Sequence, residues 1–243
     1  MQHLIIGYGE IGKTICEVLR KNKQSVECFD IIGSWNEVPG YDPENNYDVI
    51  HICFGYNKEF IQNVREYSFK YKPRCVVIHS TVKPGTCEKL DINNLVYSPV
   101  RGRHKDTLTK HVLEFVKYYS ANSISSINIF RTSFSNLKTT KCKDFKTLET
   151  AKIMCTSYMY WCLMFQKVFY KYCQENGIDF DFAYEQWNKT YNDKCDNKTF
   201  PKRFARPIYD NVNGMIGGHC LVPNIELVDN EVTKILKKFD KSL

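Results

Sequence analysis

Three glycines near the amino terminus have the spacing that a phosphate-binding turn requires. Gly7, Gly9 and Gly12 form a G-x-G-x-x-G pattern between the apolar run 4–6 and the amphipathic stretch 13–19. In a strand–turn–helix unit, the first glycine makes the tight turn, the second lets the backbone approach a pyrophosphate, and the third lets the helix pack on the strand. The helix N-terminus adds free N–H groups and a partial positive charge. The pattern predicts a dinucleotide site, against the alternative of a glycine turn in an ordinary α/β domain.

An acidic residue stands where such a site needs one. The next apolar run, residues 26–29, is followed by Asp30, about 20 positions after the glycines, and this carboxylate suits a ribose 2′-hydroxyl. A carboxylate also repels a 2′-phosphate, so the sequence favours NAD over NADP. The residues expected to contact the cofactor are Gly7, Tyr8, Gly9, Glu10, Ile11, Gly12, Asp30, Phe54, Gly55, Ser80 and Thr81.

Apolar runs and amphipathic stretches alternate over the first half of the chain. Further strands are expected at 47–55, 74–81, 95–97 and 127–130, and helices at 58–71 and 107–119. This alternation predicts a Rossmann-type, doubly wound parallel sheet in a domain of residues 1–132, with helices on both faces. Ligands of such sheets gather at the carboxyl ends of the strands.

The second half of the chain reads as helical. Residues 142–243 are expected to form an all-helical domain with a long central helix over 148–176, closed by Gly177. Shorter helices are expected at 178–191 and 224–239. Because the central helix is apolar and aromatic around its circumference, every side of it needs cover. We therefore expect a homodimer in which a second copy covers this helix.

Composition excludes several classes of protein. A chain of 243 residues with 43% hydrophobic residues can build a real core, and a net charge of +7 without an arginine-rich array disfavours nucleic-acid binding. The most apolar segment, 155–165, is far shorter than the roughly 20 residues of a membrane span. The eleven cysteines form no C-x-x-C motif, and several lie in apolar runs. With no signal-peptide pattern at the start, they predict free thiols and a cytoplasmic protein.

Four further motifs follow in order. They are Ser80-Thr81-Val82-Lys83-Pro84-Gly85-Thr86, Tyr97-Ser98-Pro99, Glu149-Thr150-Ala151-Lys152 and Gly217-Gly218-His219-Cys220. In type and order they resemble the S-T-V-x-x-G-T turn, the start of the S-P-E-R segment, the E-x-x-K helix start and the G-G-H-C loop of the nucleotide-sugar dehydrogenases, which act on UDP-glucose, GDP-mannose or UDP-acetylmannosamine. The resemblance implies two oxidations of one alcohol carbon by NAD, with an aldehyde captured by the cysteine as a thiohemiacetal and released by thioester hydrolysis.

The resemblance implies roles for particular residues. Cys220 would be the nucleophile, Lys152 would stabilise oxyanion charge or accept a proton, and Thr81 would orient a water or the nicotinamide. Thr156 replaces the asparagine of the family's helix. The alternatives are a structural cysteine after two glycines and a helix lysine that extends to solvent.

Other positions depart from the family. Val100 stands where the S-P-E glutamate assists hydrolysis, and Asn224 replaces an aspartate after the cysteine. The family's second nucleotide-binding domain has no counterpart in these 243 residues, so we expect a truncated form of the family. Oxidation to an acid and nucleotide-sugar specificity are both put in doubt.

Basic residues follow the fifth expected strand. Arg101, Arg103 and His104 could clamp a carboxylate or phosphate, with His219 and Asn224 as further substrate contacts. An exposed basic turn is the alternative. The sequence predicts an NAD-dependent oxidoreductase that acts on a sugar or a small, anionic hydroxyl or carbonyl substrate. A catalytically silent NAD-binding sensor or assembly module of the same fold is the rival interpretation.

Overall fold

A computed structural model describes the chain except residues 32–41, 104–106, 210–215, 217–220, 229–230 and 241–243. The chain divides into two compact units, residues 1–152 and 153–243. Each unit is described by itself below. No helix in the described ranges is long and apolar enough to cross a membrane. The ten cysteines in these ranges are all free thiols, as the sequence predicted for them.

One sheet forms the centre of the first unit. Its described strands are β1 (Gln2–Ile6), β2 (Ser25–Phe29), β3 (Val49–Ile52), β4 (Cys75–Ile78), β5 (Leu95–Tyr97), β6 (Lys117–Ala121) and β7 (Thr139–Lys141). They lie in the order β2-β1-β3-β4-β5-β6-β7. Neighbours are parallel except β5 and β6. The chain reverses its direction of winding between β1 and β3, which is where doubly wound sheets bind ligands.

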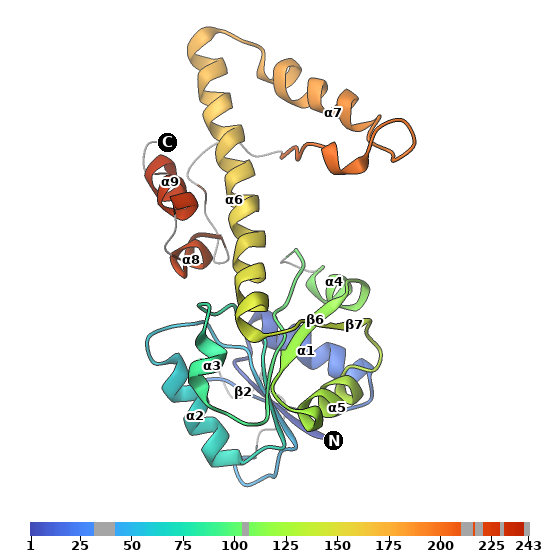
Figure 1. The fold of residues 1–243 in the computed structure, drawn as a ribbon, viewed down its shortest axis with the longest axis vertical. Helices are drawn as coiled ribbons and strands as arrows, with labels where there is room; N and C mark the ends of the chain where they lie inside the picture. Colours follow the sequence, from blue (N-terminus) through green and yellow to red (C-terminus); the bar gives the residue numbers. More distant parts are fainter. Residues whose placement is uncertain (32–41, 104–106, 210–215, 217–220, 229–230, 241–243) are drawn as a thin grey trace. The chain divides into compact units, whose positions relative to one another are not determined.

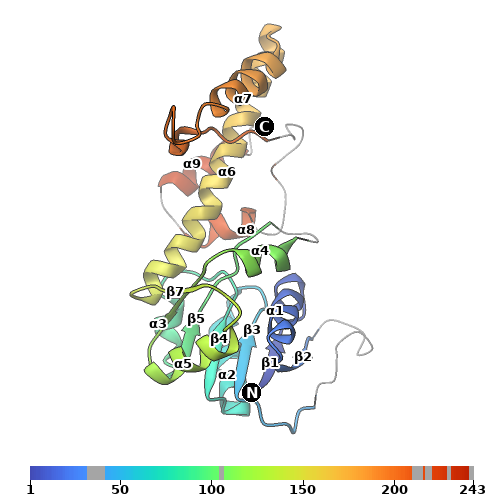
Figure 2. The same ribbon diagram turned by 90° about the vertical axis from the view of Figure 1, so that its right-hand side faces the viewer.

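Helices cover both faces of this sheet (Figures 1 and 2). The faces are covered by α1 (Glu10–Lys21), α4 (Leu108–Glu114) and α5 (Ile124–Ser133) on one side, and by α2 (Phe60–Tyr71) and α3 (Thr86–Leu90) on the other. Because strand side chains alternate, Ile5 packs toward α1 while Leu4 and Ile6 pack toward α2. The predicted Rossmann-type sheet is therefore present, although it is mixed rather than wholly parallel.

The prediction was wrong at the far edge of the sheet. Residues 127–130 are helical rather than extended, because Ser123 caps α5 by accepting the N–H of Ser126. The helix expected over 107–119 ends at Glu114, and β6 follows it. Although α4 lies between them along the chain, β6 pairs antiparallel with β5.

The long helix predicted over 148–176 is confirmed as α6 (Phe145–Asn176), which begins in the first unit. It ends at Gly177, whose φ of +63° is the left-handed conformation that closes helices. The helix expected over 178–191 is instead a π-helix, Asp181–Gln186, followed by α7 (Trp187–Asn192). The helix expected over 224–239 is divided into α8 (Leu221–Glu226) and α9 (Glu231–Asp240).

Within the second unit, parts of α6 are buried by its own chain. Tyr160 and Met164 pack with Ile225 of α8, and Phe169 contacts Phe180 and Tyr184. Another face of α6 is exposed among the residues that the structure describes. The exposed apolar residues at successive spacings of four and three are Met154, Tyr158, Trp161, Phe165, Val168 and Tyr172. We call these six residues the α6 stripe.

Candidate functional site

The glycine turn has the geometry that its sequence predicts. Gly7 has a φ of +95°, and a Cβ there would lie 2.6 Å from the backbone nitrogen of Phe54. A Cβ on Gly12 would lie 1.9 Å from the carbonyl oxygen of Gly7, so α1 can begin here only without a side chain. A Cβ on Gly9 would meet nothing within 4 Å. The first and third glycines are thus required by packing, and the second faces open space.

A cleft lies beside this turn, where β1, β2 and β3 end. It has a volume of about 1120 Å³ with its open mouth included. Five of the predicted cofactor residues line it: Gly7, Gly9, Asp30, Phe54 and Gly55. Its other walls include the aromatic rings of Phe29 and Tyr67. The cleft therefore offers flat apolar surfaces and one carboxylate at the edge where the sheet changes its winding.

Asp30 joins the turn to the cleft. Its Oδ2 accepts a hydrogen bond from the backbone N–H of Tyr8, and the residue lines the cleft. This bond fixes the carboxylate at the end of β2, across from Gly9. Tyr8, Glu10 and Ile11 lie in the turn and the first turn of α1 without lining the cleft.

Ser80 and Thr81 follow β4, at the same edge of the sheet. The Ser80 hydroxyl donates to the carbonyl of Phe54 at 2.6 Å and is buried, so it ties the ends of β3 and β4 together. Thr81 is half-buried. Neither residue lines the cleft. The hydroxyl of Ser80 therefore stabilises the strand ends and does not face the cleft.

Two of the sequence motifs meet at Glu149. This fully buried carboxylate accepts the N–H groups of Gly85 and, at 2.8 Å, of Cys87. It therefore caps α3, which has no side-chain cap of its own. Burial raises the pKa of Glu149, and the two N–H donors oppose that rise. The first turn of α6 is thereby fixed to the turn that follows β4.

The predicted catalytic residues on α6 are one helical turn apart. Lys152 is half-buried, and its charge lowers the pKa of Lys117. The Thr156 hydroxyl donates to the carbonyl of Ile153 at 2.8 Å, within its own helix. Two predicted residues, His219 and Cys220, lie outside the described residues. Asn224 is half-buried in α8.

The predicted basic clamp is partly used by the protein itself. Arg101 donates to the carbonyl of Val116 at 3.0 Å and lies over the ring of Tyr118. Arg103 is exposed, and its backbone N–H donates to His111 Nδ1. His104 lies outside the described residues. The two arginines are close along the loop, but the described contacts of Arg101 fix it to β6.

Sequence reasoning missed a row of buried polar side chains on the α1 face of the sheet. His3 Nδ1 lies 3.0 Å from His51 Nε2, and His51 Nδ1 lies 3.0 Å from His79 Nε2. His79 Nδ1 lies 2.9 Å from the carbonyl oxygen of Ser98, to which Lys117 also donates at 3.2 Å. Each histidine interrupts or ends an apolar strand, and this was the available signal.

The Ser98 carbonyl determines which ring nitrogen of each neighbouring histidine carries the proton. A carbonyl oxygen only accepts, so His79 must carry its proton on Nδ1 and accept on Nε2. The same arrangement then follows for His51, and it places a proton on His3 Nδ1. At the other end of the row, His3 Nε2 lies 3.2 Å from Oε1 of Gln24, and this contact raises the pKa of His3 while burial lowers it. Burial lowers the pKa of His51 and His79 well below the usual range, and lowers that of His3 to about 4. The row is therefore neutral at neutral pH.

Known structures share this fold. The chain superposes on UDP-D-ManNAc dehydrogenase from Pyrococcus horikoshii with a TM-score of 0.77 and 15% identity, over 99% of this chain and 68% of the other. UDP-glucose dehydrogenase from Pyrobaculum islandicum gives 0.72 and 12%, with 99% and 68% covered. 3-Hydroxyisobutyrate dehydrogenase from Mycobacterium tuberculosis gives 0.64 and 11%, with 99% and 92% covered. No protein-family model and no curated protein sequence matches the chain.

The fold is therefore that of the nucleotide-sugar and hydroxyacid dehydrogenases. The structural match covers 65–68% of the nucleotide-sugar dehydrogenase chains, in agreement with the resemblance in the sequence. At these identities the likeness establishes the architecture. It does not assign the chemistry of any side chain.

The neutral histidine row predicts a loss of stability in mild acid. Unfolded histidines bind protons below about pH 6.5, whereas the folded row does not, so the free energy of unfolding should fall as pH is lowered. Each of the three histidines contributes to this fall below that point, until pH reaches its folded pKa, about 4 for His3. Urea unfolding between about pH 8 and pH 5 measures this slope. A His111→Gln variant, changed at a half-buried histidine outside the row, should keep it, and a flat profile in the native protein would contradict the neutral row.

Proposed function

We propose that this chain is an NAD-dependent dehydrogenase that moves a hydride between NAD and the alcohol or carbonyl carbon of a sugar or another small, anionic substrate. The cleft lined by Gly7, Gly9 and Asp30 carries this proposal, because it joins a pyrophosphate turn to a ribose-binding carboxylate at the switch point of the sheet. The shared fold with dehydrogenases supports it.

Asp30 gives the preference for NAD. Its carboxylate would accept hydrogen bonds from the ribose hydroxyls, and its charge would repel the additional phosphate of NADP. The Tyr8 N–H that Asp30 already accepts keeps it in place before the cofactor binds. The aromatic rings of Phe29 and Tyr67 would flank the adenine.

Lys152 and Cys220 are the proposed reactive groups. The Lys152 ammonium would stabilise the charge on the substrate oxygen or take up its proton, and the Cys220 thiol would add to a carbonyl carbon. Thr81 and Thr156 would support them by hydrogen bonding. The bound cofactor would accept or supply the hydride. These roles come from the sequence motifs and from the place of Lys152 on α6.

The departures from the motif limit the reaction. Val100 is buried and apolar, so it cannot activate a water for thioester hydrolysis. Asn224 cannot act as an acid or base. A single hydride transfer between alcohol and carbonyl is therefore the proposed reaction. The same two residues favour the rival proposal, a catalytically silent NAD-binding module.

An anionic substrate fits the basic loop after β5. Arg103 is exposed and would provide charge for a carboxylate or phosphate, together with Arg101, His104, His219 and Asn224. Because Arg101 already donates to Val116, it would bind a substrate with its remaining N–H groups.

A second copy of the chain is the proposed partner. The α6 stripe repeats at spacings of four and three, which is the seam along which two helices pack knobs into holes. Phe165 and Tyr158 are each more than half exposed in the single chain. An apolar stripe of this length is costly in water, and an identical helix offers a matching surface.

Alanine substitutions at Gly9 and Gly12 should have different effects, the first on NAD binding and the second on stability. Gly9→Ala should keep the fold, since its Cβ meets nothing and its φ of −70° suits alanine, but it should weaken NAD binding about tenfold or more because the methyl faces the pyrophosphate. Gly12→Ala should destabilise the protein by about 3 kcal/mol or more, because its Cβ collides with the Gly7 carbonyl. Calorimetric titration with NAD and thermal melting separate the two effects. Unchanged NAD affinity in Gly9→Ala would remove the turn from the cofactor site.

If the chain transfers a hydride as proposed, its turnover should depend on Lys152 of α6. With NAD and a panel of UDP-sugars, sugar phosphates and hydroxy acids, NADH should form, and Lys152→Met should lower kcat/KM about 100-fold or more. Cys220→Ser should abolish turnover if the thiol adds to the substrate, and it should leave turnover intact if the thiol is structural. Tight NAD binding without turnover of any substrate would favour the silent module.

The α6 stripe predicts a dimer in solution. Light scattering should give twice the mass of 28.5 kDa, and Phe165→Glu should give a monomer because a buried charge at the centre of the seam lacks a partner. Gln174→Glu adds the same charge to α6 at an exposed position outside the stripe, so it should remain dimeric. A monomeric native protein would refute the proposed pairing.

A further inference from the structure

A lysine lies in the core at the start of β6. Lys117 is only 5% exposed, on the same face of the sheet as the histidine row. Its Nζ donates to the Ser98 carbonyl at 3.2 Å and lies 5.6 Å from the centre of the Phe134 ring. Buried lysines normally have an acidic partner that offsets the cost of losing water.

Lys117 has no such partner among the described residues. The charged and titratable groups that face it are the Cys53 thiol at the end of β3, the two cations Lys152 and Arg101, and the rings of His51 and His79. Burial lowers the pKa of Lys117 to about 7; Cys53 opposes this, and Lys152 and Arg101 add to it. At neutral pH a large share of this side chain is therefore an uncharged, nucleophilic amine.

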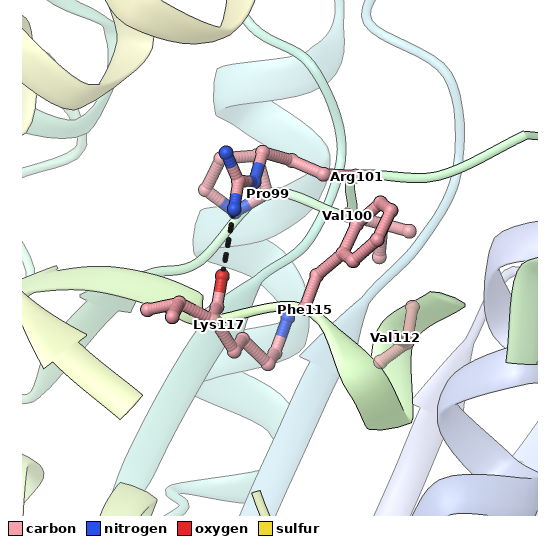
Figure 3. Close-up of a pocket in the computed structure, with 7 residues that line it drawn as sticks. Pro99, Val100, Arg101, Val112, Phe115 and Lys117 are labelled. Carbon is pink, nitrogen blue, oxygen red and sulfur yellow. Dashed lines mark hydrogen bonds between the residues drawn. The ribbon is translucent and has the colours of Figure 1, made fainter. Parts of the chain in front are cut away.

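A small cavity adjoins this lysine (Figure 3). Its volume is about 210 Å³ with its open mouth included, and it is lined by Pro99, Val100, Arg101, Val112, Phe115, Val116 and Lys117. Most of these side chains are apolar, and the space inside holds about one water molecule. Figure 3 shows the guanidinium of Arg101 on the carbonyl of Val116 at this cavity. Only a small molecule could enter this cavity, and an uncharged one would enter at the lowest cost.

We propose that Lys117 is a carbamylation site that takes up carbon dioxide. The Nζ lone pair forms a bond to the carbon of CO2, and one C=O π pair moves to oxygen. The nitrogen then releases one proton to water. The product is a carbamate with one negative charge, and the step needs no oxidant, reductant or metal.

The charges around the cavity favour this product. The free protein places one ionisable amine near two cations, Arg101 and Lys152, whereas the carbamate places an anion there. Bicarbonate carries its charge into the cavity and must lose its water, but CO2 does not. The proposal does not depend on the dehydrogenase activity, since it concerns the free protein.

Carbon-13 NMR of the full chain with ¹³C-labelled CO2 tests the proposal directly. The native protein should show a carbamate resonance that Lys117→Met lacks and that Lys110→Met, changed at an exposed lysine, retains. The amino-terminal amine can also react, so any resonance left in Lys117→Met should disappear when that amine is acetylated. At fixed dissolved CO2 the Lys117 signal should grow from about pH 6 to about pH 8, because the amine must lose its proton.

A second measurement covers a variant that fails to fold. Carbamates in the native protein are trapped by O-alkylation with a trialkyloxonium salt, and the digested protein is examined by mass spectrometry. The alkyl carbamate should map to the peptide that contains Lys117. A carbamate resonance that persists unchanged in Lys117→Met, or a trapped group found only on other amines, would overturn the proposal.

Discussion

The close contact of two glycines determines the rest of the first unit. Helix α1 begins at the glycine turn, where Gly12 lies so close to the carbonyl oxygen of Gly7 that no Cβ fits between them. This contact places the free N–H groups of the helix at the end of β1, beside the end of β3. The sheet changes its winding at the same point, so the cleft follows from the contact together with the topology. A side chain larger than hydrogen at Gly12 would separate α1 from β1.

The core of the first unit has an unusual polar content. Three imidazoles and one amine cross a largely apolar face, and the contacts of the imidazoles run from Gln24 through the three rings to the Ser98 carbonyl. Such a network is stable only when each member has its partner, since an unpaired buried group costs about 1–3 kcal/mol. Phe134 packs edge-on against His51 and His79 and lies near Lys117. The row thereby joins the amino edge of the sheet at His3 to the loop at Ser98 that leads to the basic residues.

Helix α6 connects the two units through different kinds of contact along its length. Its first turn makes a polar contact, because the buried carboxylate of Glu149 caps α3. Its later turns contact α8 and the π-helix by apolar and aromatic packing. The α6 stripe forms a further face of this helix, and its six side chains are exposed in the single chain. One helix therefore carries a fixed anchor, an internal packing surface and a surface suited to a second helix.

The sequence by itself determined the features that depend on local spacing. The turn Gly7–Gly12, the alternation of strands and helices, and the long helix ending at Gly177 are all encoded by neighbouring residues, because steric limits and side-chain period act over a few positions. Antiparallel β6, the helix over Ile124–Ser133 and the Lys117 cavity were decided by tertiary structure. So was the meeting of His3, His51 and His79, which come from separate strands. Strand register sets which polar groups share one face, and register arises from pairing between segments that are far apart along the chain.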